Sequence, residues 1–194
     1  MASDVSRRPG RPRSQQADAA ILAAALDLLV ESGAGQTSIE QVARRAGVTR
    51  ATVYRRFAGK TELLIEAIEA GNDPDRPAPD WPDLPAMIAD WSGYLSQPRN
   101  RRMLRRLYGA VDDFPELLET YRNLFGGARS EAVFAVLRKE IAAGRLPADS
   151  DVGVILALLN GAILHHLGGY GDDCDARDLE KYLLAAVRQL GLRS

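Results

Sequence analysis

The segment TSIEQVARRAGVTRATVYRRF, residues 37–57, decides the predicted fold of the first part of this 194-residue chain. Thr37 followed by Glu40 has the spacing of a capping box, which predicts that a helix begins here. Gly47 can adopt the left-handed conformation that ends such a helix. Thr49 can cap a second, short helix directly afterwards. Two helices joined by a short turn that contains glycine are typical of a helix-turn-helix.

The flanking residues supply helices on which this motif can pack. Val53 and Phe57 are four residues apart, so both point to the same side of the short helix. The preceding segment DAAILAAALDLLVESG carries an apolar stripe that predicts a long amphipathic helix. Its stripe consists of Ile21, Ala25, Leu28 and Leu29. The following segment KTELLIEAIEAG predicts a fourth helix, so we expect residues 15–70 to form one helical domain with a connecting helix.

Charge is unevenly distributed along the chain. Residues 1–60 contain ten Lys and Arg against five Asp and Glu, a net charge of +5, whereas residues 61–194 contain fifteen against twenty-one, a net charge of −6. A basic end favours contact with nucleic acid. The alternative is that these arginines only solvate two helices, because most charged surface residues have no special role.

The second helix of a helix-turn-helix lies in the DNA major groove, so its outward side chains are candidate contacts. The Arg50 guanidinium matches the two major-groove acceptors of guanine. Tyr54 and Lys60 suit phosphate oxygens. Arg55 and Arg56 are compatible with either phosphate contact or solvent exposure. Of these two, only Arg55 is included among the predicted DNA contacts.

This region resembles the DNA-binding domain of the TetR (tetracycline repressor) family of bacterial transcriptional regulators. The resemblance rests on ILAAALDLL, on TSIEQVARRAGVTRATVYRRF and on GKTELL, which ends an aromatic-turn-lysine-leucine pattern. It implies phosphate contacts from some residues and base contacts from others. The implied phosphate contacts are Thr37, Thr49, Thr52, Tyr54 and Lys60, and the residues implied to face bases are Arg50 and Ala51. Ala51 stands where many members have glycine and Arg56 where many have histidine, which bears on the operator sequence.

Residues 1–14 are expected to form a basic, disordered arm, because RRPGRPR has arginines but no side chains that could build a core. The arm is either a solubilising tail or a minor-groove arm, since narrow A·T-rich minor grooves attract inserted arginines. On the second interpretation Arg11 and Arg13 contact DNA.

The rest of the chain predicts a second, larger helical domain. Residues 71–83 contain four prolines and are expected to form a linker. Residues 84–194 contain further helical segments, of which the longest is interrupted by Gly126 and Gly127. Convincing strand alternation is missing, so the predicted fold is all-α with about nine helices: a three-helix DNA-binding domain and a larger regulatory and dimerisation bundle.

The resemblance implies two tasks for this larger domain, homodimerisation and the sensing of a small molecule. Residues 151–168 and 178–190 are the predicted dimer helices, because both are rich in aliphatic side chains. Residues 151–168 are apolar nearly all round, so they must be buried in a core or against another subunit. The alternative is that both helices belong to the core of a single subunit.

Aromatic and polar side chains of this domain are the predicted pocket for a lipophilic or aromatic effector, because pockets in helical bundles are lined mainly by apolar groups. The alternative is an ordinary core. The predicted pocket residues are Trp91, Tyr94, Met103, Leu107, Tyr108, Phe114, Tyr121, Phe125, Asn160 and His165.

Two histidines and one cysteine leave little material for catalysis or metal binding, so we expect neither an enzyme nor a cofactor or metal site. No apolar run approaches the roughly 18 residues of a membrane span, so we expect no membrane partner. The single cysteine, Cys174, cannot form an internal disulfide, so we expect the protein in the reducing cytoplasm. The predicted function is a ligand-responsive repressor that binds a palindromic operator in double-stranded DNA as a homodimer. The alternative is a dimeric DNA-binding protein without an effector.

Overall fold

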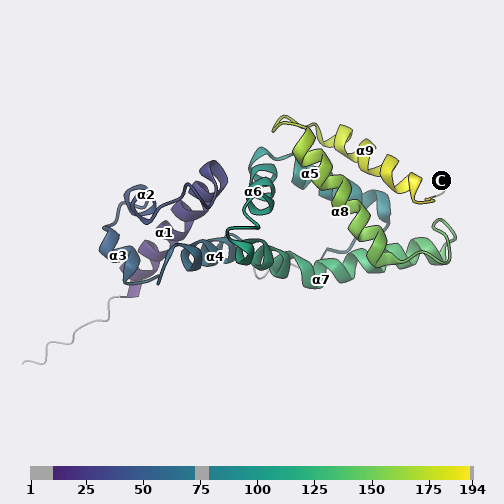
Figure 1. The fold of residues 1–194 in the computed structure, drawn as a ribbon. Coiled ribbons are helices and arrows are strands. Elements are labelled where there is room, and N and C mark those ends of the chain that lie inside the picture. Colours follow the sequence, from purple (N-terminus) through teal and green to yellow (C-terminus); the bar gives the residue numbers. More distant parts are fainter. Residues whose placement is uncertain (1–10, 73–78, 193–194) are drawn as a thin grey trace, which may run out of the picture. The chain divides into compact units, whose positions relative to one another are not determined.

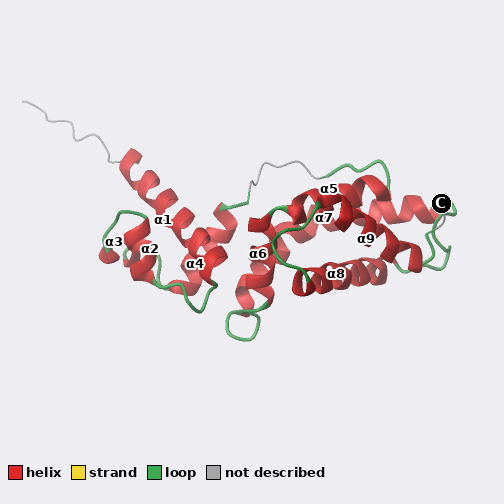
Figure 2. Cartoon of the chain, turned by 90° about the horizontal axis from the view of Figure 1, so that it is seen from above, coloured by secondary structure: helices red, strands yellow, loops and turns green. Residues whose placement is uncertain are grey.

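The computed structural model describes residues 11–72 and 79–192, with side chains undescribed at 11–14 and 125–128 (Figure 1). The chain divides into two compact units, Met1–Asn72 and Asp73–Ser194. Every regular element in the described ranges is a helix (Figure 2), and there are nine of them. The all-α prediction is therefore confirmed.

Four helices build the first unit. They are α1 (Arg11–Ser32), α2 (Ile39–Arg45), α3 (Arg50–Tyr54) and α4 (Lys60–Ala70). The stripe predicted on α1 is buried at all four of its positions. It packs against α2 and α4, and α2 in turn packs against α3. The short helices α2 and α3 are thereby held on a scaffold of two longer ones.

Helix α1 begins earlier than the sequence pattern predicted. Its helical backbone starts at Arg11, so the last four residues of the arm expected at 1–14 belong to the helix. Pro12 does not prevent this, because the N–H groups of the first helical turn have no partner within the helix. The remaining arm residues, 1–10, lie outside the described part of the chain.

The cap of α2 corrects the sequence prediction by one residue. Ser38, not Thr37, is the N-cap: its hydroxyl accepts from the Gln41 backbone N–H at 3.2 Å, and the Gln41 side chain accepts from the Ser38 N–H at 2.8 Å. Thr37 is buried, and its hydroxyl donates to the Gly33 carbonyl at 2.9 Å. The capping box is therefore Ser38 with Gln41, because the tight turn after α1 uses the Thr37 hydroxyl.

Five helices build the second unit. They are α5 (Leu84–Ser96), α6 (Pro98–Tyr108), α7 (Pro115–Ala142), α8 (Val152–Gly169) and α9 (Ala176–Gln189). Helix α5 is central, since it packs against α6, α7 and α9. Its buried side chains share one core with those of α7, α8 and α9. Trp81, at the end of the predicted linker, is buried in the same core.

Helix α7 runs without a break through Gly126 and Gly127, where the sequence analysis expected an interruption. A glycine inside a helix costs only about 1 kcal/mol relative to alanine. The helical segments on either side are long, and Val133, Val136 and Leu137 anchor the second of them in the core. Packing therefore outweighs the low helix propensity of two glycines.

Helix α8 has the apolar composition that the sequence showed, but most of it is not buried. The expectation that no segment reaches the length of a membrane span was wrong. By length and composition alone, residues 152–169 could cross a membrane, since their mean hydropathy is 1.6. Four residues are buried, Ile155, Leu159, His166 and Leu167. Val154 and Leu158 remain half exposed. The helix therefore presents an apolar face that its own unit leaves open.

Candidate nucleic-acid interface and effector pocket

The turn between α2 and α3 depends on Gly47. This residue has φ +67°, a left-handed conformation that side-chain-bearing residues rarely adopt. The next residue ties the turn to the last turn of α2, since the Val48 N–H donates to the Ala43 carbonyl at 3.0 Å. The chain thus reverses within a few residues and α3 starts at Arg50.

Helix α3 is fixed by one cap and by two buried side chains. The Thr49 hydroxyl accepts from the Thr52 backbone N–H at 3.2 Å, and the two threonine hydroxyls lie 2.9 Å apart. Val53 and Phe57 are buried in the unit's core. Because these two residues face inward, the opposite side of α3 faces solvent.

The solvent-facing side of α3 carries basic and hydrogen-bonding groups. Arg50, Ala51, Tyr54 and Arg55 are exposed. Arg50 forms an ion pair with Glu40 at 2.8 Å and donates to the Tyr54 hydroxyl at 3.2 Å. The Tyr54 hydroxyl, and then the Glu40 carboxylate, raise the pKa of Arg50. An ion pair between side chains this exposed contributes at most about 1 kcal/mol, so Arg50 can exchange Glu40 for another acceptor at little cost.

Two other basic residues near α3 are engaged inside the unit. Arg56 forms an ion pair with Asp18 of α1 and donates to the Thr52 carbonyl at 3.2 Å. Its side chain is only 19% exposed, so its role is to fasten the end of α3 to α1. Lys60 is half buried and donates to the Ala34 carbonyl at 2.9 Å, so it also ties α4 to the turn after α1.

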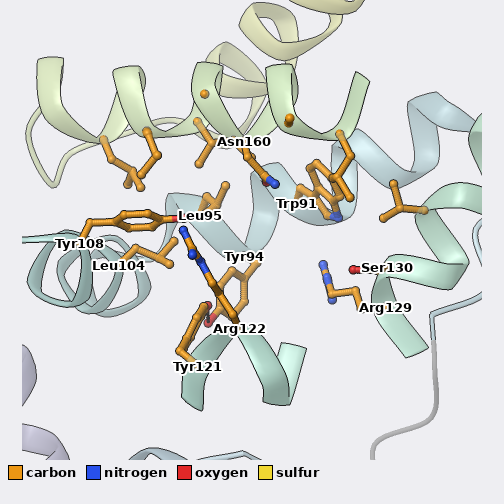
Figure 3. A pocket seen from close by; sticks show the side chains of 17 residues that line it. Trp91, Tyr94, Leu95, Leu104, Tyr108, Tyr121, Arg122, Arg129, Ser130 and Asn160 are labelled. Carbon is orange, nitrogen blue, oxygen red and sulfur yellow. Dashed lines mark hydrogen bonds between the residues drawn. The ribbon is translucent and has the colours of Figure 1, made fainter. Parts of the chain in front are cut away.

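The second unit contains a cavity of about 640 Å³ between α5, α6, α7 and α8 (Figure 3). This volume is in the range of small-molecule sites. Its described lining residues are Trp91, Tyr94, Leu95, Leu104, Tyr108, Tyr121, Arg122, Arg129, Ser130, Val133, Leu156, Ala157, Asn160, Gly161, Ile163, Leu164 and Leu167. Most of them are apolar or aromatic, and the polar groups come mainly from α7.

Two features define the polarity of this cavity. The hydroxyls of Tyr94 and Tyr121 lie 3.4 Å apart, and burial, followed by the neighbouring Tyr94, raises the pKa of Tyr121, which keeps its phenol neutral. The indole N–H of Trp91 is buried and has no hydrogen-bond partner among the described residues. A buried donor without an acceptor destabilises the structure, so this position favours a ligand atom that accepts a hydrogen bond.

Comparison with known families agrees with this geometry. A sequence model of bacterial regulatory proteins of the tetR family matches residues 21–67, and a model of the tetracyclin repressor-like C-terminal domain matches residues 81–186. This chain belongs to the TetR family. It is therefore a DNA-binding transcriptional regulator of the helix-turn-helix type, and its family is not one of enzymes.

Individual relatives extend the family match over most of the chain. The HTH-type transcriptional regulator YdeS of Bacillus subtilis is 30% identical over 177 residues, which cover 88% of this chain and 89% of YdeS. Among solved structures, Salmonella enterica GusR has a TM-score of 0.71 at 18% identity, covering 95% of this chain and 99% of GusR. NalD, the secondary repressor of the MexAB-OprM multidrug efflux pump in Pseudomonas aeruginosa, has a TM-score of 0.60 at 23% identity, covering 89% of this chain and 97% of NalD. These two structures share the TetR fold with this chain.

The TetR helix-turn-helix gathers most of the predicted DNA contacts on one surface. Thr49, Arg50, Ala51, Tyr54 and Arg55 are exposed, and Thr52 is half buried beside them. The other predicted contacts differ. Lys60 is half buried and already donates to the Ala34 carbonyl. Thr37 is 3% exposed and its hydroxyl is already hydrogen bonded, so it is not part of this surface. The side chains of Arg11 and Arg13 lie outside the described residues.

The cavity gathers half of the predicted effector residues. Trp91, Tyr94, Tyr108, Tyr121 and Asn160 line it. Four others do not: Leu107 is fully buried in the protein core, His165 is exposed, and Met103 and Phe114 are half buried away from the lining. The side chain of Phe125 is outside the described residues. Helical spacing alone does not separate a cavity wall from a packed core, because both need apolar side chains on one face.

Sequence reasoning missed the arginines of the cavity. Arg122 and Arg129 line it, seven residues apart on α7. A spacing of seven places both on the same face of a helix, which is the signal that was available. This signal is weak, because arginines on a helix usually indicate a solvated face.

Proposed function

We propose that this TetR-family protein is a repressor that binds a palindromic operator as a homodimer and is released when a small molecule occupies the cavity of the second unit. The observation that supports the effector is the 640 Å³ cavity, because its size and its mainly apolar lining are those of small-molecule sites. The protein would act in the bacterial cytoplasm, where its operator lies.

On this proposal α3 enters the major groove. Arg50 and Ala51 face base edges, and Arg50 leaves Glu40 to form a bidentate contact with guanine. Phosphate contacts fix the position of α3 on the DNA. They are made by Thr49, Thr52, Tyr54, Arg55 and Lys60. Arg11 and Arg13 follow the minor groove beside it. Thr37 is left out, because its hydroxyl is used inside the protein.

The homodimer is proposed to form through α8, with α9 alongside it. Val154 is 54% exposed and Leu158 is 50% exposed on α8, although both are large aliphatic side chains. Burying this face against a second copy would remove the apolar surface from water, at about 25 cal/mol per Å². Helix α9 uses Leu179, Leu183 and Val187 in the core of its own unit, so it contributes less to such an interface.

Release by an effector is a shift between two populations of the dimer. The form that binds the operator holds its two α3 helices at the half-site spacing, and the effector binds more tightly to a form with another spacing. The factor by which the bound effector lowers the affinity for DNA therefore equals the factor by which bound DNA lowers the affinity for the effector.

The first test is the selection of DNA fragments by the purified protein, followed by variants on the selected site. Arg50→Ala is expected to relax base preference at one position per half-site, worth about 1–3 kcal/mol of discrimination. Tyr54→Phe is expected to weaken binding to all sequences by about 1 kcal/mol, roughly fivefold. The matched control is Arg138→Ala, which removes an exposed arginine of α7 in the other unit.

The result that would contradict the DNA part is unchanged base preference in the Arg50 variant and unchanged affinity in the Tyr54 variant. The effector part has its own measurement, the release of the protein from the selected operator by small molecules. Retention of the operator complex with every ligand that binds the cavity would favour the alternative, a dimeric DNA-binding regulator without an effector.

A further inference from the structure

The described residues that line the cavity include two cations, Arg122 and Arg129, and no carboxylate. Both are on α7, and seven residues of helix separate them by about 10 Å along its axis. A cavity that carries positive charge without a lining acid favours an anionic ligand and disfavours a cationic one. The rest of the lining is dominated by aliphatic and aromatic side chains, which favour an apolar body.

The two arginines differ in their surroundings. Arg122 is exposed, and its guanidinium lies 5.7 Å from the centre of the Tyr108 ring. Arg129 is more enclosed, with 26% of its side chain exposed. Its guanidinium packs 5.2 Å from the centre of the Trp81 ring. The rings of Trp81 and Trp91 are packed edge to face, with their centres 6.4 Å apart. Only the second arginine therefore belongs to the tryptophan cluster of the core.

Hydrogen-bond donors converge at the Arg129 end of the cavity. Figure 3 shows Trp91 of α5 facing Ser130 and Arg129 of α7 across the open space. The Trp91 indole N–H is buried and lacks an acceptor among the described residues. Indole and guanidinium groups can only donate, and the serine hydroxyl can donate as well. This end of the cavity therefore offers donors and a positive charge to a group that only accepts.

Arg129 is not fully neutralised by its own ion pair. One of its terminal nitrogens, Nη2, lies 3.2 Å from an oxygen of Asp90, whose side chain is 41% exposed. A guanidinium has five N–H donors, so donors remain for a second acceptor. Because Asp90 is partly exposed to water, its charge compensates that of Arg129 less than an anion inside the cavity would.

We propose that the effector of this cavity is an organic acid with an apolar or aromatic body, whose carboxylate is held by Arg129, Ser130 and the Trp91 N–H. This inference rests on the proposed effector function and names its ligand class. The carboxylate supplies the acceptor that the indole N–H lacks, and the body packs on the aliphatic lining from α6 and α8. A partly enclosed carboxylate accepts charge-assisted hydrogen bonds, so it is expected to bind about tenfold or more tightly than a neutral group of the same shape.

The test measures binding of two matched sets of probes to the full chain by titration calorimetry. The sets are octanoate, octanamide and octylammonium, and naphthoate, naphthamide and naphthylmethylammonium. In each set the body is constant and only the head group changes. We expect the acid of at least one set to bind about tenfold more tightly than its amide, and the ammonium compound to bind most weakly.

Three variants assign the carboxylate to its site. Arg129→Gln is expected to abolish the preference for acid over amide. Asp90→Asn breaks the same ion pair but keeps the cation, so it is expected to preserve or increase that preference. Arg122→Gln removes the other arginine from the same helix and the same cavity, and is expected to leave the preference within about twofold. Circular dichroism melts show that each variant is folded.

The inference would be overturned by equal binding of acid and amide, by a preference for the ammonium compounds, by loss of the preference in Arg122→Gln instead of Arg129→Gln, or by binding of none of the probes at about 1 mM. Failure of the effector function gives a different result. In that case the acid binds as expected, and the bound acid leaves the affinity for the selected operator unchanged.

Discussion

Arg101 is fully buried in the second unit, and it faces carbonyl groups rather than a carboxylate. Its guanidinium donates to the Tyr170 carbonyl at 3.2 Å and to the Gly171 carbonyl at 3.1 Å. These carbonyls follow the C-terminus of α8, where the helix dipole favours a positive charge. Arg101 therefore fastens α6 to the end of α8.

His166 of α8 is the titratable partner of Arg101. Its Nδ1 lies 3.4 Å from the guanidinium, and since a guanidinium only donates, Nδ1 accepts and the neutral ring carries its proton on Nε2. The ring stacks on Tyr170 and lies beside Tyr182 of α9. Burial, then the charge of Arg101 and that of His165, lower the pKa of His166 below its ordinary value of 6.5.

This lowered pKa predicts a loss of stability in mild acid. As the pH falls from above 6.5 through the lowered pKa, the unfolded chain binds a proton at His166 before the folded chain does, so the free energy of unfolding decreases. Thermal melts between pH 7 and pH 5 should therefore show a falling Tm. His166→Asn keeps an acceptor near Nδ1 but does not titrate, so it should reduce this decrease.

The control for this prediction is the neighbouring histidine. His165 is exposed, so His165→Asn is expected to retain most of the pH dependence of the unmodified chain. Equal pH dependence of the unmodified chain and of His166→Asn would show that other groups cause the decrease.

At the scale of elements, α2 and α3 are too short to be stable alone. Helix α2 has seven residues and α3 has five, so their caps, the packing of α2 on α1 and the packing of α3 on α2 hold them in place. Thr49 caps α3 at its start, and Arg56 fastens its end to Asp18. The rigidity of the solvent-facing side of α3 therefore depends on these few contacts.

The corrected cap of α2 is open to a direct comparison. Ser38→Ala removes the hydroxyl that accepts from the Gln41 N–H and is expected to lower the free energy of unfolding by about 1 kcal/mol. Glu40→Ala leaves the Ser38–Gln41 pair intact and is expected to lower it by less than Ser38→Ala does, because the ion pair of Glu40 with Arg50 joins two exposed side chains. Urea unfolding of both variants measures the difference. A larger loss for Glu40→Ala would favour the capping box that begins at Thr37.

At the scale of the whole molecule, the exposed apolar face of α8 governs assembly. Leu158→Glu places a charge in the centre of the proposed dimer interface, where it would be buried without a partner. We expect the variant to sediment as a monomer in analytical ultracentrifugation and to lose operator binding by at least about a hundredfold, because one half-site alone binds weakly.

The matched control is Val111→Glu. Val111 is 43% exposed, a value close to that of Leu158, but it lies between α6 and α7 and not on α8. It is expected to remain a dimer and to bind the operator normally. A dimeric Leu158→Glu chain would show that another surface carries the interface.

The sequence by itself determined the helical architecture and the family. Apolar spacing is a local property, so the stripe of α1 and the inward positions of Val53 and Phe57 were predicted correctly. The cap of α2 was misplaced by one residue because Thr37 and Ser38 are both good caps, and a tertiary contact decides between them.

Only the tertiary structure decided which side chains line a cavity, which are core, and which apolar face stays open. Leu107 and Tyr108 are adjacent in sequence, yet the first is core and the second lines the cavity. In the sequence Arg122 and Arg129 are indistinguishable from solvated arginines, whereas in the fold both line the cavity between α5, α6, α7 and α8. Composition likewise predicted that α8 is buried in a core or against another subunit, and within its own unit Val154 and Leu158 stay half exposed. These properties depend on contacts between residues far apart in the chain, which local spacing does not encode.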